Sequence, residues 1–152
     1  MTQEEDRRIK NLEISMREHR HKSIDGTLPV VQSSFITFSL ASTTAQTATN
    51  YALIFTATFP CSVFAVSETH SVAGTDASAV TLQIERLTGT QALAAGTVLL
   101  NTAINLKGTA DTAQRANLIN QTGLKIGDRL ALRVAGVLTS LSGVQVTIEL
   151  RT

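Results

Sequence analysis

The chain lacks several features that define common protein classes. It has a single cysteine, Cys61, which excludes an intramolecular disulfide. Its 152 residues contain no long apolar run of the kind that a transmembrane helix needs. The first residues are charged rather than apolar, so we expect no secretory signal peptide. We therefore expect the chain to be made in the cytoplasm of the producing cell. The net charge of +1 gives no electrostatic reason to expect a nucleic acid or a membrane as partner.

Motifs of catalysis are also missing. The sequence has no GxSxG elbow, Walker A loop, GxGxxG loop, HExxH helix or CxxC pair. Carboxylates are sparse after residue 26, and no two of them stand out as a general acid and base. His70 has serine and acidic neighbours in sequence, but a triad needs spatial geometry, so we expect a solvated loop histidine. We expect Cys61 to be a small buried hydrophobe, and we expect no enzymatic activity.

Charge is distributed unevenly along the chain. Residues 1–25 hold twelve of the 25 charged side chains, and the other 127 residues share thirteen. This change in composition near Gly26 and Pro29 predicts a boundary between a helical segment over residues 1–26 and a sheet domain over residues 27–152.

The N-terminal segment has the pattern of a short coiled-coil helix. It lacks Gly and Pro from Gln3 to His19, and it places one apolar or seam position every three or four residues, at Ile9, Leu12, Met16 and His19. A polar helix with so narrow an apolar stripe is not stable alone in water. One interpretation is a helix that lies across its own domain. The other, which we favour, is a parallel bundle of identical chains, so we expect a homotrimer with these four residues as its seam.

From Val30 onward the pattern has the period of a β-strand. The alternation is clear over residues 33–40 and 80–85, and turn residues such as those in the Lys125–Arg129 segment separate the runs. About eight strands are expected, over residues 30–40, 51–59, 62–67, 80–85, 97–100, 103–106, 129–135 and 144–150, with a possible helix over residues 112–119. These features predict a mainly β fold, an antiparallel jelly-roll-like sandwich preceded by the short N-terminal helix.

Threonine is abundant, with 22 residues in the chain. Its branched β-carbon suits a strand while its hydroxyl stays hydrated. Such strands are either simply soluble, or they form an uncharged surface that can press against a neighbouring protein without burying unpaired charges.

The segment His19-Arg20-His21 is a candidate metal site. Two histidines supply only half of the ligands that most metal sites need. Three parallel chains would supply six imidazoles around their axis, enough for an octahedral first-row metal ion. His21 would join His19 only where the helix unwinds, because residues two apart point to different sides of a helix. Alternatively, His19 is a polar seam residue and His21 lies on the surface.

The runs RIKNLE (residues 8–13), REHRH (17–21) and DGT (25–27) resemble the N-terminal segments of tailed-bacteriophage virion proteins. The Ala/Thr/Gly-rich strands and the run GDRLALRV (127–134) are similar to the trimeric jelly-roll modules of phage head decoration (cement) proteins and fibre tips. Phage fibres hold axial metal ions with HxH motifs, and the resemblance implies this role for His19 and His21.

Two functions follow from the resemblance. The first is a homotrimeric decoration protein that binds the major capsid protein and stabilises the assembled head; small size, near-neutral charge and Thr-rich strands favour it. The second is a short tail fibre or spike that attaches to a tail or baseplate protein and binds a host surface receptor. The absence of Trp weakens the second, because aromatic rings are the usual platforms for sugars. Either function places the protein in the virion.

Overall fold

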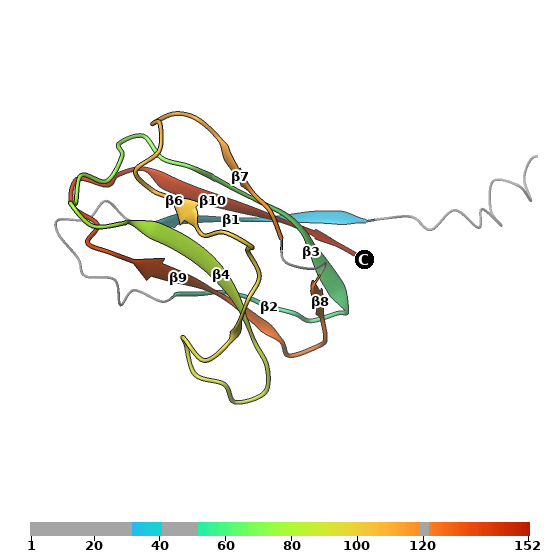
Figure 1. Cartoon of the computed structure of the whole chain (residues 1–152). Helices are drawn as coiled ribbons and strands as arrows, with labels where there is room; N and C mark the ends of the chain where they lie inside the picture. Colours follow the sequence, from blue (N-terminus) through green and yellow to red (C-terminus); the bar gives the residue numbers. More distant parts are fainter. Residues whose placement is uncertain (1–31, 41–51, 119–121) are drawn as a thin grey trace, which may run out of the picture. The chain divides into compact units, whose positions relative to one another are not determined.

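The computed structural model describes residues 32–40, 52–118 and 122–152. These residues form antiparallel β-strands and no helix, as the period-two pattern predicts (Figure 1). The strands are β1 (Ser33–Leu40), β2 (Ala52–Thr56), β3 (Cys61–Thr69), β4 (Thr81–Leu87), β5 (Thr97–Val98), β6 (Ile104–Asn105), β7 (Gln114–Ala116), β8 (Thr122–Leu124), β9 (Arg129–Ala135) and β10 (Val144–Arg151). Across the described ranges, no helix has the length and hydropathy to span a bilayer.

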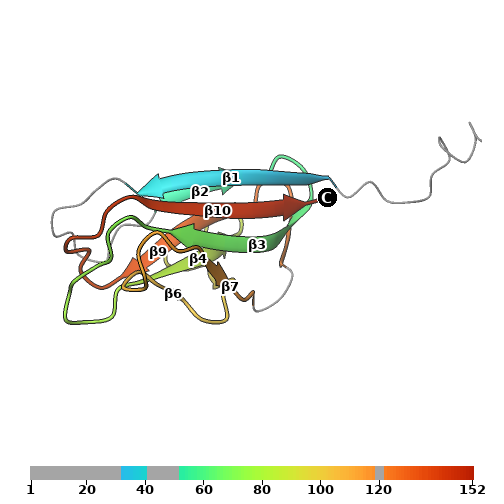
Figure 2. The same cartoon turned by 90° about the horizontal axis from the view of Figure 1, so that it is seen from above.

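The strands form two sheets. The first has the order β1-β10-β3-β7, with β8 also paired to β3, and the second has the order β2-β9-β4-β5, with β6 also paired to β4. Figure 2 shows β1, β10 and β3 side by side in the first sheet. The short strands β7 and β8 pair with successive parts of β3, and β5 and β6 pair with successive parts of β4.

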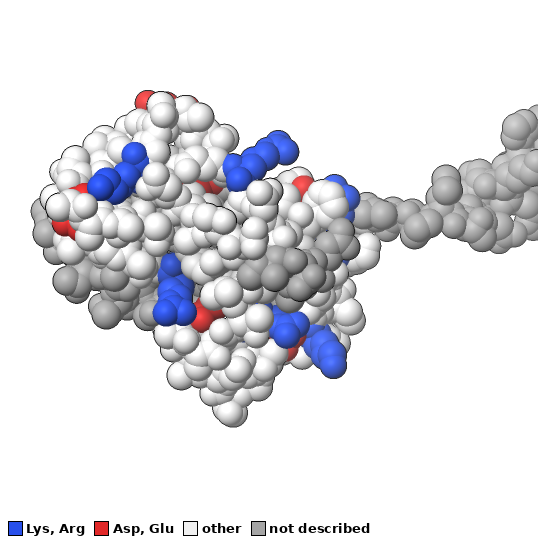
Figure 3. Space-filling view, viewed as in Figure 1, with Lys and Arg blue, Asp and Glu red and all other residues white. Residues whose placement is uncertain are grey.

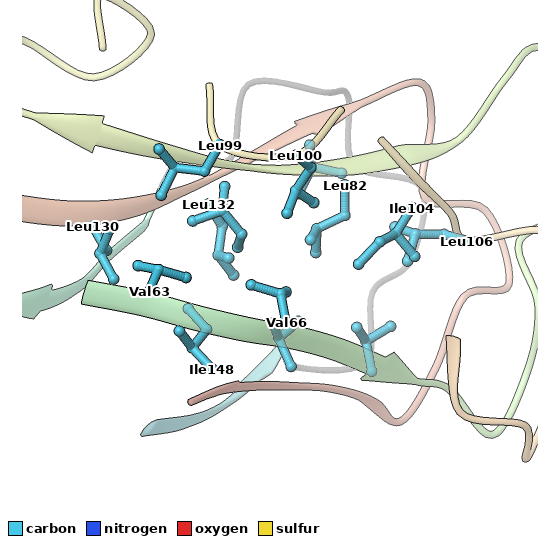
Figure 4. Close-up of a cluster of buried hydrophobic side chains, with 14 of the residues drawn as sticks. Val63, Val66, Leu82, Leu99, Leu100, Ile104, Leu106, Leu130, Leu132 and Ile148 are labelled. Carbon is cyan, nitrogen blue, oxygen red and sulfur yellow. The ribbon is translucent and has the colours of Figure 1, made fainter. Parts of the chain in front are cut away.

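The core lies between the two sheets. Apolar residues of β3 and β10 point inward from one sheet, and those of β4 and β9 point inward from the other (Figure 4). The residues that share this core include Val63, Val66, Leu82, Ile84, Leu130, Leu132, Val146 and Ile148. Burying each such side chain contributes about 1.5–3 kcal/mol, so the facing apolar rows hold the sheets together.

Two features of the fold differ from the sequence-based expectation. The prediction of a helix over residues 112–119 is wrong, because Gln114–Ala116 form β7, paired with β3. The strand β8, over Thr122–Leu124, was not expected. Both are three-residue strands, too short to show a period, and their conformation comes from pairing with β3 rather than from local preference.

The turn at Lys125–Arg129 is confirmed. Gly127 has a φ of +88°, and the Asp128 carboxylate accepts a hydrogen bond from the backbone N–H of Lys125 at 2.9 Å. The expected N-terminal helix and its seam residues Ile9, Leu12, Met16 and His19 lie outside the described residues, as does His21.

Candidate protein-contact surface

The outward face of the first sheet is the candidate functional surface. The register aligns Phe35 of β1 with Glu149 of β10 and Ala65 of β3, and it aligns Thr37 with Thr147 and Ser67. We call this face the β1–β10–β3 surface. Its residues outside the charged pair described below are mostly Ser, Thr, Ala and Phe, as the threonine-rich composition led us to expect.

A bulge shapes this surface. Glu149 pairs with Ala65, and the next residue, Leu150, pairs with Val63, so Phe64 is an extra residue in β3. The bulge lets Val63 and Val66 both enter the core although they are three residues apart, a spacing that regular alternation would not allow. Phe64 is consequently directed outward, with 39% of its surface exposed.

A groove of about 530 Å³ runs over the surface. Phe35 and Phe64 line it together with Thr147 and Glu149 of the intervening β10, and it extends to β7 and the residues after it. Phe35 is 67% exposed, the second largest exposure among the large apolar side chains described. An aromatic ring this exposed costs free energy in water, which is a common property of sites that bind another molecule.

Two of the charges at the groove, Glu149 and Arg151, compensate one another. The Glu149 carboxylate accepts hydrogen bonds from Arg151 Nε at 2.8 Å and from Ser33 Oγ at 3.1 Å. The Arg151 guanidinium carbon lies 3.0 Å from the centroid of the Phe64 ring. The groove therefore offers aromatic and hydroxyl groups around this neutralised pair, with the exposed Arg115 in its wall at β7. In the view of Figure 3, most of the surface is uncharged, and several cationic side chains lie next to an acidic one.

A buried polar cluster holds the far wall of the groove in place. The Glu68 carboxylate lies 2.9 Å from His70 Nδ1 and accepts a hydrogen bond from Gln114 Nε2 at 3.0 Å. Gln114 also donates to the carbonyl of Asn105 at 2.8 Å. Since Gln114 begins β7, these bonds fix β7 on β3 and so position the groove residues Arg115 and Ala116.

His70 differs from our expectation of a solvated loop histidine. Its side chain is completely buried, and Nε2 lies 3.1 Å from the Gly108 carbonyl oxygen. The residues Glu68 and His70 are two apart at the end of a strand, so they share one face, and this spacing is a sequence signal that our expectation of a loop histidine missed. Burial raises the pKa of Glu68, while the hydrogen bonds from His70 and Gln114 oppose that rise. With the ring enclosed and both nitrogens engaged, the arrangement is a structural one.

A second buried carboxylate fixes a loop on the other sheet. Glu85 of β4 accepts hydrogen bonds from the backbone N–H groups of Ala94 at 2.8 Å and Gly96 at 3.3 Å. Side chains of this kind satisfy loop backbone groups that would otherwise be buried without partners. Glu85 therefore has a role in holding the loop.

Cys61 is buried, as predicted, and its burial raises the pKa of the thiol. A thiol with a raised pKa carries little thiolate and is a poor nucleophile. Among residues 32–40, 52–118 and 122–152, no group of three or more His, Cys, Asp or Glu side chains is placed to hold a metal ion. The proposed ligands His19 and His21 lie outside these ranges, so the metal site stays a prediction.

No protein-family model matches the sequence, and no curated protein does. A solved structure does match: a chain of the cyanophage Pam1 capsid asymmetric unit superimposes with a TM-score of 0.54. The alignment covers 80% of this chain and 84% of that chain, at 16% sequence identity. The two chains therefore share a fold across most of their length.

Proposed function

We propose that this protein is a structural component of a bacteriophage virion, and specifically a homotrimeric capsid decoration (cement) protein. The observation that carries the proposal is the fold shared with a chain of a phage capsid asymmetric unit. Because the alignment covers similar fractions of both chains, the matched capsid chain is about as short as this one. A short chain is suited to binding on a shell that other proteins build.

We infer a jelly roll from the strand order. If β5 with β6 and β7 with β8 are each counted as one interrupted strand, the chain has eight strands in its described part. Their order is then 1-8-3-6 in one sheet and 2-7-4-5 in the other. This is the order produced when a long hairpin wraps over itself into two sheets, an architecture used by many viral capsid domains.

The β1–β10–β3 surface supports contact with a neighbouring capsid protein. Its exposed rings, Phe35 and Phe64, supply apolar area, and a partner can cover the Glu149–Arg151 pair without leaving either of these two charges unpaired. Binding of this kind stabilises a shell by mass action, since a ligand that binds only the assembled state shifts the equilibrium toward that state. The action proposed requires no catalysis.

The homotrimer remains part of the proposal. In it, Ile9, Leu12, Met16 and His19 of three chains form a common seam, and the three sheet domains meet the capsid around one axis. The seam joins the copies, and the sheet surface contacts the lattice.

The alternative is a short tail fibre or spike that binds a receptor on the host. The groove beside Phe35 and Phe64 favours this alternative, because aromatic rings next to Ser, Thr, Asn and Glu side chains can bind sugars. The two functions differ in where the protein sits and in copy number.

Localisation in the virion tests both functions. We expect antibody labelling or a virion reconstruction to show many copies on the head, and addition of the purified protein to undecorated heads to raise the temperature at which they release DNA. Labelling of a few copies at the tail would support the alternative. A virion without the protein at either place would contradict the proposed function.

A further inference from the structure

Among the described residues, β1 is a sheet edge whose outer side pairs with no other strand. It is eight residues long and pairs with β10 in an unbroken register. Every other edge strand in the described ranges is short or bulged: β5 and β6 have two residues each, β7 and β8 have three, and β2 has five with a register shift. Short and bulged edges are how proteins prevent unwanted strand pairing, and β1 has neither device.

The register shows which backbone groups of β1 face the open side. The Thr152 N–H donates to the Gln32 carbonyl at 3.2 Å, in line with the Ser33–Arg151 pair of the ladder. In an antiparallel ladder, residues alternate between directing both backbone groups to the partner and directing both away. Gln32 and the even-numbered residues of β1 therefore bond to β10. The N–H and C=O groups of Ser33, Phe35, Thr37 and Ser39 point to the open side.

The edge also carries no charge. The sequence has no Asp, Glu, Lys, Arg or His between Asp25 and Glu68, a stretch that includes the whole of β1. Edge strands are usually guarded by Lys or another charged residue, because a charge prevents a second strand from docking. An open edge of eight residues with neither charge nor proline is a template for another extended chain.

We propose that β1 pairs with β1 of a second copy of this chain. A symmetric antiparallel pair that uses all four open residues has one register: Ser33 opposite Ser39 of the partner subunit, and Phe35 opposite Thr37 of the partner subunit. Each of these pairs exchanges two backbone hydrogen bonds. In a two-fold pair, a charged residue near the axis would face its own copy, and like charges placed opposite each other are destabilising. The uncharged sequence of β1 meets this condition.

Pairing would cover apolar surface that one copy leaves open. Phe35 is mostly exposed, and Ile36 and Phe38 are only partly buried against the core. In the proposed register, Ile36 lies on the two-fold axis against Ile36 of the partner subunit. The first sheets of the two copies then form one continuous sheet. This inference does not depend on the proposed function, because it concerns the purified chain.

Disulfide trapping tests the register. Ile36 opposite its own copy is a non-hydrogen-bonded pair, with Cα atoms about 4.5 Å apart, within the range that a disulfide spans. We expect full-length Ile36→Cys to form a covalent dimer on mild air oxidation. The matched control is Leu40→Cys, on the same face of β1. In the proposed register Leu40 lies opposite Gln32 of the partner subunit, eight residues from Leu40 of the partner subunit, so we expect this variant to stay uncrosslinked. The wild type supplies the baseline, since Cys61 is buried. Equal crosslinking of both variants, or of neither, would overturn the proposal.

Sedimentation provides a measurement without a new thiol. We expect the wild type to populate species with an even number of chains, a number that the proposed trimer reaches when two trimers pair through β1, and Thr37→Lys to weaken that association at least tenfold. The control Thr102→Lys places the same charge on an exposed turn and should leave the association unchanged. A wild type without an even-numbered species, or an unchanged association constant in Thr37→Lys, would contradict the pairing. Absence of the protein from the virion would contradict the proposed function alone.

Discussion

Glu68 and His70 are joined by a hydrogen bond of 2.9 Å while both side chains are excluded from solvent. The Nε2 atom of His70 lies beside the Gly108 carbonyl oxygen, which can only accept, so Nε2 carries a hydrogen and donates. The contact between Nδ1 and the Glu68 carboxyl group then requires a hydrogen between these two groups. Either Nδ1 carries it and donates to the carboxylate, or the carboxylic acid carries it and donates to Nδ1. This pair connects the end of β3 to the loop that leads into β7.

Replacing His70 with Ala should destabilise the fold substantially. The change leaves the Glu68 carboxyl group and the Gly108 carbonyl buried without their partner, and breaking a buried pair in this way costs about 3 kcal/mol. Urea unfolding should show a lower midpoint with an unchanged slope. Glu149→Ala, which removes a partly exposed ion pair, should cost less than about 1 kcal/mol. Similar losses in the two variants would contradict the structural role of the buried pair.

The pH dependence of stability should reveal Glu68. Burial raises its pKa above the ordinary value of 4.5, so its contribution to stability is complete below pH 4.5 and is lost as pH rises through the raised pKa. Glu68→Gln keeps the shape of the neutral acid and cannot ionise. We expect the free energy of unfolding of the wild type to fall relative to that of Glu68→Gln as pH increases from about 4 to 8. A difference of the opposite sign would contradict the raised pKa.

Two glycines with nearly the same φ should respond differently to alanine. Gly136 and Gly127 have φ values of +91° and +88°. A Cβ on Gly136 would overlap the carbonyl oxygen of Ala79, whereas a Cβ on Gly127 would meet no atom within 4 Å. Gly127→Ala should therefore cost about 1–2 kcal/mol from backbone strain alone, and Gly136→Ala clearly more. Thermal unfolding of both variants measures these losses of stability. Equal losses would show that the backbone at Ala79 can shift to make room for the added methyl group at no cost.

Two phenylalanines with the same exposure separate binding from folding. Phe64 and Phe59 are each 39% exposed, but Phe64 lines the groove and Phe59 does not. We expect Phe64→Ser to weaken binding to undecorated heads about tenfold, in the range for an aromatic contact at an interface. Phe59→Ser should bind like the wild type. Equal binding by the two variants would show that the β1–β10–β3 surface does not contact the capsid.

The metal prediction concerns the N-terminal segment. Protein purified without a polyhistidine tag should contain about one first-row metal ion per three chains, since six imidazoles of a trimer complete one octahedral site. The double variant His19→Ala/His21→Ala should lose the ion. Metal-free wild-type protein, or an ion retained by the double variant, would contradict the site.

The period of hydrophobicity was enough to predict the long strands. Leu82 and Ile84 alternate with polar residues in β4, and Val144, Val146 and Ile148 do so in β10, because a strand with one buried face requires that pattern. The turn at Gly127 and Asp128 was also evident locally, since positive φ and an Asp side chain bonded to nearby backbone are properties of single residues. Burial of Cys61 followed from its apolar neighbours.

Features that depend on contacts between distant segments were decided by the tertiary structure. The bulge that directs Phe64 outward depends on where Val63 and Val66 meet the opposite sheet. The burial of His70 depends on a loop nearly forty residues away, and β7 is a strand only because β3 lies beside it. The sequence alone determined which residues are apolar and so favour burial. Packing between the two sheets decided which of these apolar residues are buried and which stay exposed, since burial is a property of the assembled layers and not of the local chain.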